Sequence, residues 1–289
     1  MSNTTSLINK VKLWAAVPSS QPAFSVANLL VLMTDELRTN IAPLLMSCME
    51  EFYVVYQDFT ISSSTTSFNI PARAIGLKLR DVKIVDGSGT ETDVPRINPD
   101  HSQSHNFGFY MRGNKIFFLS PGDYATYSLR LYYYTRPSTL IETTAAATIT
   151  TVGTDTLVVS SVPSTWTSPM TVDVVQATSP YGLIGTSVTS TWTGTTFTLS
   201  VPADTAVGDY ICIQEESPVP FLPEEWHSLL TQAVVIRVME ALLDKKGLEV
   251  SLRRFDDMKQ KAFDIISPRI DGELARINPY ESFLDGPSI

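Results

Sequence analysis

The stretch from residue 222 to residue 266 constrains the fold most, because it predicts two consecutive helices. The first begins at Pro223, a favourable residue for a first helical turn, and is apolar on most of its circumference. Gly247 is a suitable residue directly after the C-terminal end of this helix. A helix with so little polar surface is expected to pack against neighbours on several sides.

The second predicted helix runs from about Val250 to Ile266 and is amphipathic, with an apolar residue at every third or fourth position. Pro268 ends it, because proline cannot continue a helix. A largely buried helix beside a half-buried one requires a further partner, either within the chain or from another chain. The side chains expected to pack in this helical core are Trp226, Leu230, Ala233, Met239, Phe255 and Phe263.

A third helical pattern covers residues 26–53, with Ser25 as a plausible N-cap. Pro43 lies inside this pattern and is expected to kink or split the helix near Asn40. Residues 1–24 are expected to be an irregular lead-in, since Pro18 and Pro22 disfavour regular structure.

Two stretches of different character predict β structure. Residues 57–141 contain alternating and aromatic runs, with the clearest hairpin at residues 107–118. Residues 142–219 are rich in Thr and Ser, and glycines and prolines separate short β-like runs. This second pattern is typical of a small all-β sandwich or barrel.

The predicted class is therefore α+β, with four parts. Residues 1–141 and 220–267 form one core, in which the N-terminal helix and the C-terminal helical hairpin build a small bundle beside a β region. Residues 142–219 are an inserted all-β domain, and residues 268–289 are an extended tail. The tail has apolar residues without a period, so it is either disordered or ordered by a partner surface. Its expected docking residues are Ile277, Pro279, Tyr280, Phe283 and Leu284.

The net charge of −9 arises from one region of the chain. Between residues 137 and 236 there is no Lys or Arg but nine acidic residues, which leaves 21 acidic and 21 basic residues elsewhere. Contact with nucleic-acid phosphates needs Lys and Arg. This region is therefore not expected to grip DNA.

No pattern typical of a catalytic, metal or cofactor site is present in the sequence. There is no glycine-rich phosphate loop, no Gly-x-Ser-x-Gly and no His-Glu-x-x-His. His101 and His105 are expected in a solvated loop rather than a metal site, and His227 near a helix start. Cys48 and Cys212 are expected to be buried free thiols. No apolar run reaches the roughly 18 residues of a membrane span.

Several segments resemble the head-to-tail adaptor, or connector, proteins of tailed bacteriophages, especially short-tailed ones. The similar segments are residues 24–30 (FSVANLL), 35–38 (DELR), 41–45 (IAPLL), 50–54 (EEFYV), 129–140 (LRLYYYTRPSTL) and 222–227 (LPEEWH). The resemblance covers residues 24–141 and 220–267, and it leaves out the Thr-rich insert and the tail.

This resemblance implies a structural virion protein at the neck, the head-to-tail interface, assembled in the host cytoplasm. Such adaptors form a ring, typically dodecameric, beneath the portal protein. The ring extends the DNA channel, through which the genome passes without sequence-specific binding, and docks the tail, nozzle or fibre proteins. The resemblance implies no enzymatic activity and no cofactor. The insert lies outside the resemblance, and because it is rich in acidic residues and has no basic ones, it is expected to face outward or to meet tail components.

Two other hypotheses remain open from the sequence. In one, the chain is a tail or capsid decoration protein whose insert binds a host glycan through Trp166, Tyr181 and Trp192, although core packing explains these rings better. In the other, it is a tail hydrolase, for which no pair of carboxylates can be selected from the sequence.

Overall fold

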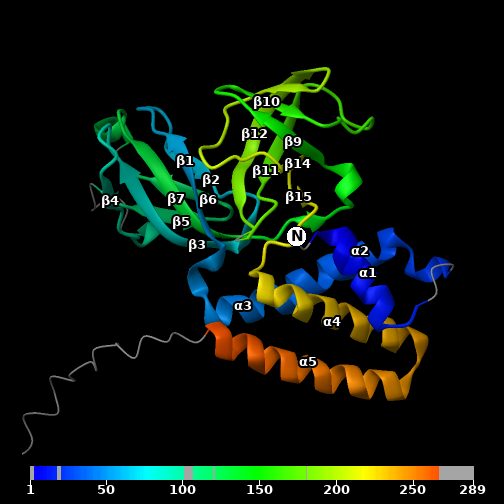
Figure 1. Cartoon of the computed structure of the whole chain (residues 1–289). Helices are drawn as coiled ribbons and strands as arrows, with labels where there is room; N and C mark the ends of the chain where they lie inside the picture. Colours follow the sequence, from blue (N-terminus) through cyan, green and yellow to red (C-terminus); the bar gives the residue numbers. More distant parts are fainter. Residues whose placement is uncertain (1–2, 18–20, 101–106, 120, 180, 267–289) are drawn as a thin grey trace, which may run out of the picture.

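The computed structural model of the chain has a helical bundle, a first β unit and a β-barrel (Figure 1). It describes residues 3–17, 21–100, 107–119, 121–179 and 181–266. Helices and strands occupy separate blocks of the chain, which confirms the α+β class and the pairing of N-terminal and C-terminal helices in one bundle.

The helical bundle is built around α4 (Glu224–Leu242). Three helices contact it: α1 (Thr4–Trp14), α2 (Val26–Glu36) and α5 (Lys245–Ile266). Most of the side chains of α4 are buried as a result, and Trp226 and Leu230 have no exposed surface. The further neighbours that the apolar circumference of α4 requires are therefore supplied within the chain, so its burial requires no second copy.

The expectation of an irregular lead-in over residues 1–24 is wrong, because α1 lies there. The Asn3 side chain accepts a hydrogen bond from the Ser6 N–H at 2.9 Å and caps the helix. Leu7, Ile8 and Val11 fall on one face and are buried in the bundle core. The prolines that suggested irregular structure all lie beyond the end of this helix.

The helix expected over residues 26–53 is divided, as its proline predicts. α2 ends at Glu36, Leu37–Ile41 form a π-helical segment, and α3 (Ala42–Cys48) follows. Pro43 has no N–H to donate in the helical ladder, which favours a local widening at this point. A short 3₁₀ turn, Glu50–Tyr53, then leads into the first strand.

Two residues connect α4 to α5. Leu243 closes α4 in the left-handed conformation, with φ 57°. The Asp244 carboxylate then accepts the N–H of Gly247 at 3.0 Å and caps α5, which therefore begins at Lys245. The predictions that Gly247 follows the first helix and that the second begins near Val250 are both wrong for this reason.

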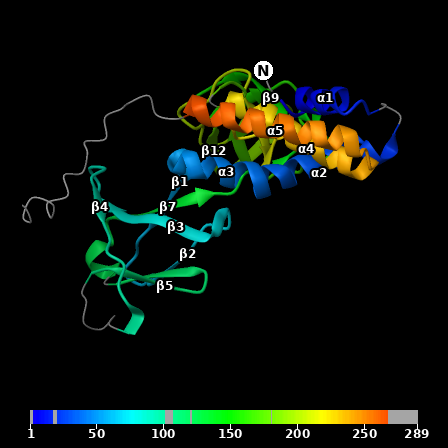
Figure 2. The ribbon, with the colours of Figure 1, turned by 90° about the horizontal axis from the view of Figure 1, so that it is seen from below.

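The first β unit is a sandwich of two antiparallel sheets (Figure 2). The two sheets enclose a core of their own, centred on residues such as Phe118 and Leu131. The hairpin predicted at residues 107–118 is confirmed as β5–β6, with Gly113 at φ 62° in its turn. One sheet has the order β1 (Val54–Thr60), β7 (Ser128–Thr135), β3 (Ala74–Val85), β4 (Glu91–Asp93), and the other β2 (Ser67–Asn69), β6 (Lys115–Phe118), β5 (Phe109–Arg112).

The Thr-rich stretch forms a closed barrel rather than an open sandwich. Its interior is filled by apolar side chains, among them Ile149, Leu157 and Phe197. Glycines and prolines occur between its strands, as the sequence pattern predicts. The strand order is β10 (Thr156–Val159), β13 (Thr196–Thr198), β12 (Leu183–Thr193), β11 (Met170–Val175), β14 (Tyr210–Ile213), β9 (Ala147–Val152).

The chain enters and leaves the barrel through two short parallel strands, β8 (Thr139–Leu140) and β15 (Glu216–Ser217). Both are attached to the bundle. The Thr4 N–H donates to Pro218 O at 2.9 Å, and the Thr4 hydroxyl donates to Ile141 O at 2.7 Å. The Leu140 N–H donates to the Thr34 hydroxyl at 3.0 Å. These bonds fix the base of the barrel on α1 and α2.

Candidate interaction surfaces

A buried ion pair joins the barrel to the first β unit. Arg73, just before β3, donates from Nη1 to Asp173 Oδ2 of β11 at 2.6 Å, and from Nη2 to the Ser138 hydroxyl at 2.8 Å. The Asp173 carboxylate also accepts the N–H groups of Ser187 and Glu215, both at 2.8 Å. Since the two side chains are 5% and 0% exposed, neither charge is solvated, and each depends on the other.

The acidic residues of the insert are not all on its surface. Asp173 and Asp209 are both buried, and their partners explain why. Asp173 is neutralised by a base from outside the base-free stretch, while Asp209 accepts the N–H groups of Ala177 and Ala206 at 2.9 and 2.8 Å. Asp155 and Asp204 are exposed on the barrel.

A second contact joins the barrel to the helical bundle. The rings of Tyr181, which follows β11, and His227, in the first turn of α4, lie with centroids 4.8 Å apart. Both side chains are buried, and burial lowers the pKa of His227 to about 4. His227 is therefore neutral near pH 7 and belongs to the barrel junction as well as to the helix start.

The aromatic residues considered for glycan binding do not form one exposed platform. Trp166 is buried in the barrel core, where it contacts the half-buried Trp192 edge-on, and Trp192 stacks on Phe197 at 5.0 Å. Tyr181 is buried in a different cluster at the barrel junction. Core packing thus accounts for two of the three rings.

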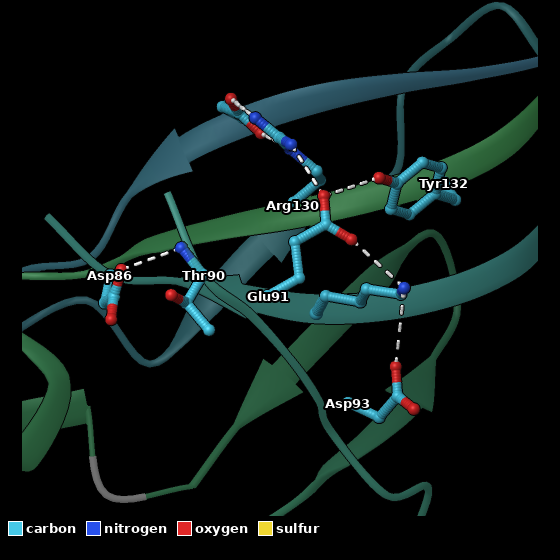
Figure 3. Close-up of polar contacts among 8 residues, drawn as sticks. Asp86, Thr90, Glu91, Asp93, Arg130 and Tyr132 are labelled. Carbon is cyan, nitrogen blue, oxygen red and sulfur yellow. Dashed lines mark hydrogen bonds and ion pairs between the residues drawn. The ribbon is translucent and has the colours of Figure 1, made fainter. Parts of the chain in front are cut away.

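The outer face of the four-stranded sheet carries a network of charges that are half-buried at its centre (Figure 3). Glu91 Oε1 accepts from Arg130 Nη1 and from the Tyr132 hydroxyl, each at 2.7 Å, while Oε2 lies 3.0 Å from Lys83 Nζ. The hydrogen bond from Tyr132, followed by those from Lys83 and Arg130, lowers the pKa of Glu91 to about 2. Arg130 also forms a bidentate pair with Asp58, with distances of 2.7 and 2.8 Å.

Tyrosine side chains extend this face across the sheet. Tyr56 is 53% exposed and lies under the Arg130 guanidinium, 4.1 Å from the ring centroid. Lys78 Nζ lies 4.5 Å from the centroid of Tyr134, whose hydroxyl donates to Glu50. The sequence analysis did not single out this face. Its signal is the alternation within β7, where Arg130, Tyr132 and Tyr134 point to the same side of the strand.

An open groove lies between α2 and the base of the barrel. It has a volume of about 730 Å³ and is lined by α2, by residues 139–145 and by the barrel loop 163–165. Val31 is 61% exposed in this groove, and Asp35 and Arg38 are also in its wall. The Arg38 side chain is engaged by Pro137 O and the Thr139 hydroxyl.

The side chains predicted for the helical core lie together in it. Trp226, Leu230, Ala233 and Met239 are buried in one cluster, and Phe255 and Phe263 are half-buried against that cluster. The predicted docking residues of the tail lie outside the described residues, and so do His101 and His105.

The two thiols differ from expectation at one position. Cys212 is buried in β14, but Cys48 is exposed at the end of α3, on the side turned away from the bundle core. Over the described ranges, no group of three or more His, Cys, Asp or Glu side chains could hold a metal ion. The helices in those ranges are also too short or too polar to cross a membrane.

Comparison with known families gives the context for these surfaces. Residues 2–167 match the family described as SU10 adaptor protein. The chain belongs to this family. The SU10 adaptor match includes α1 and the first two barrel strands, both of which lie outside the resembling stretches 24–141 and 220–267, and it does not include residues 220–267. No curated protein matches the chain.

Membership of the SU10 adaptor family makes the chain a structural adaptor of a bacteriophage virion, associated with the portal and tail at the neck. The bundle and first β unit contain most of the matched residues, whereas α4, α5 and the later barrel strands lie beyond the match. The adaptor family is a structural one.

Proposed function

We propose that this adaptor forms a closed ring, dodecameric as is typical of such proteins, beneath the portal. The ring extends the DNA channel of the neck and docks the tail. The observation that carries the proposal is the SU10 adaptor match over residues 2–167, which includes α1 to α3 and the first β unit. The self-contained helical bundle supports it, because a rigid subunit can be repeated around an axis without refolding.

DNA passes such a ring without sequence-specific contacts. The charge distribution supports this part of the proposal, since the barrel and the first turns of α4 fall in the stretch without Lys or Arg. Tight binding to phosphates would require those side chains. A glycan-binding role has no comparable support, because Trp166 and Tyr181 are buried.

The proposal is tested by mixing the purified protein with the portal protein of the same phage. Mass photometry and cryo-electron microscopy should show a ring of adaptor subunits on one face of the portal. A protein that stays monomeric and unbound beside the portal would contradict the proposal.

The tail is the proposed docking segment for the portal or for a neighbouring copy, through Ile277, Pro279, Tyr280, Phe283 and Leu284. Deleting residues 269–289 should weaken portal binding and leave the subunit folded, because α4 is already enclosed by α1, α2 and α5. Portal binding is measured by surface plasmon resonance, and folding by circular dichroism. Replacing the five residues by Ser in the full-length chain separates loss of the docking side chains from loss of chain length, and unchanged portal binding by both variants would contradict the assignment.

A further inference from the structure

One end of the helical bundle exposes apolar side chains that the subunit core does not use. Figure 1 shows α1 ending beside the α4–α5 turn. At this end Leu13 is 76% exposed, Leu243 84% and Val250 67%. We call this surface the bundle tip, and it consists of Leu13, Trp14, Leu243, Lys246, Val250 and Arg254.

Leu243 is the most informative residue of the bundle tip. It occupies the left-handed conformation at φ 57°, a position after a helix at which glycine is the usual residue. A leucine at this position is strained and, at 84% exposure, contributes almost nothing to the core. Strained residues and exposed apolar groups of this kind are found at binding surfaces.

The bundle tip is also concave and positively charged. A cavity of about 330 Å³ lies between Trp14 and the first turns of α5. Lys246 and Arg254 line it, and Arg254 lies 4.3 Å from the centroid of the Trp14 ring. Within the described ranges neither base forms an ion pair, and the nearby Asp244 carboxylate is engaged by the Gly247 N–H. A fitting partner therefore presents apolar and acidic groups together.

The barrel presents apolar and acidic side chains together. Val152, the last residue of β9, is 36% exposed, and Val207, in the loop before β14, is 67% exposed. Asp155 and Asp204 are exposed in the loop after β9 and the loop before β14, respectively. The bond from the Gly208 N–H to Ile149 O, at 2.9 Å, joins the second loop to β9, the strand that leads into the first. We call this surface the barrel edge: Val152, Asp155, Asp204 and Val207. No Lys or Arg occurs in the barrel sequence to oppose a basic partner.

We propose that the bundle tip of one copy docks on the barrel edge of the next copy. The inference rests on the proposed ring and names the surfaces that build it. The two surfaces are different parts of one chain, so the contact is head-to-tail and repeats from copy to copy, as a closed ring requires. DNA is the other acidic partner available at the neck, but phosphates do not cover exposed leucine and valine side chains, whereas the barrel edge does.

Reversing the charges tests the pairing. In the full-length protein, the double variant Lys246→Glu/Arg254→Glu and the double variant Asp155→Lys/Asp204→Lys should each weaken self-association at least about tenfold, because like charges then meet. Combining all four substitutions should restore association. Sedimentation velocity measures the self-association of each variant, alone and with the portal. Lys115→Glu is the control, since Lys115 is exposed and lies in the β5–β6 hairpin of the first β unit, which belongs to neither surface.

A ring that forms normally with either reversed pair would overturn this inference and leave the adaptor function intact. Absence of any ring from the wild-type protein, with and without portal, would instead overturn the proposed function and this inference with it. Reversal at the bundle tip that leaves self-association unchanged but weakens binding to duplex DNA would assign the tip to DNA and overturn the pairing.

Leu243→Gly provides a test that does not depend on charge. Glycine relieves the left-handed strain, so the melting temperature of the monomer should rise, while loss of the exposed leucine should weaken self-association. A residue with only a structural role would change the melting temperature and leave association unaltered, and that result would contradict the proposal. Ile265→Ala, at an exposed apolar position on α5 outside the bundle tip, should leave association unchanged.

Discussion

The barrel junction and the outer face of the four-stranded sheet use the same kind of contact in opposite surroundings. At the junction, Arg73 and Asp173 are 5% and 0% exposed. On the outer face, Arg130 is 19% exposed and Asp58 40% exposed, and both remain accessible to water. Both arginines bind carboxylates at 2.6–2.7 Å, so distance does not distinguish the two sites.

The difference lies in what happens when one partner is removed. A charge left unpaired at the junction remains in a dry environment, which is strongly unfavourable. A charge left on the outer face is solvated again, and the loss is small. The junction is thus expected to determine whether the barrel stays attached to the sheet, whereas the outer face remains available to contact other proteins.

The largest effect is expected at Asp173. Asp173→Ala should lower the free energy of unfolding by about 3–5 kcal/mol, because it leaves the Arg73 guanidinium buried without its counter-charge. It also leaves the N–H groups of Ser187 and Glu215 without their acceptor. Urea denaturation followed by circular dichroism measures this change.

The matched double variant sharpens the comparison. Arg73→Met/Asp173→Leu removes both charges and should recover part of the stability lost in Asp173→Leu alone, since no unpaired charge remains. Recovery should be incomplete because the two backbone N–H groups stay unpaired. A loss below about 1 kcal/mol in Asp173→Ala would show that the junction is as wet as the outer face.

The junction pair could not be found from the sequence, although much of the fold could, and the alternation within β7 was a local signal of the outer face. Periodicity identified α4, α5 and α2, and Pro43 identified the break between α2 and α3, because these signals are local. Arg73 and Asp173 are 100 positions apart, and only the placement of the barrel brings them together. Conversely, the apolar circumference of α4 predicted a further partner but not which one, because the contribution of α1 was missed.

The second-largest effect on stability is expected at His227, which lies at the contact between the barrel and the helical bundle, and this effect depends on pH. Its folded pKa of about 4 lies below the usual value of 6.5, so the unfolded chain binds a proton between these two values and the folded chain does not. The neutral ring contributes its full stability above pH 6.5, and the contribution is lost as the pH falls from 6.5 to 4. At pH 5 the loss is about 2 kcal/mol, and below pH 4 it reaches about 3 kcal/mol.

His227→Gln isolates this contribution, because glutamine does not titrate. In urea melts, the free energy of unfolding of the wild type, relative to that of the variant, should fall between pH 7 and pH 5. A difference that is the same at both values would show that water reaches the ring, and Tyr181 would then not be closing the junction.

Local signals also fail at the surfaces proposed for contact. Leu243 is an ordinary apolar residue at the end of a helix pattern, and the choice of Gly247 as the terminator followed a general preference. What decided the helix start instead was a hydrogen bond between the Asp244 side chain and the Gly247 N–H. Exposure of Leu243 and strain at its backbone are properties of the assembled subunit, so no periodicity could have revealed the bundle tip.

The smallest effect is expected on the outer face of the sheet. Arg130→Lys breaks the bidentate pair with Asp58 but leaves a solvated cation, so the cost should stay under about 1 kcal/mol and shrink further in high salt. Glu91 adds a pH signature there. Its folded pKa of about 2 lies below the usual 4.5, so its contribution is present above pH 4.5 and is lost as the pH falls from 4.5 towards 2. Glu91→Gln should remove that slope in thermal melts. Arg130→Lys could instead lower the free energy of unfolding as much as Asp173→Ala. That result would mean that the outer face is shielded from water in the purified protein, as expected of a sheet already covered by another copy.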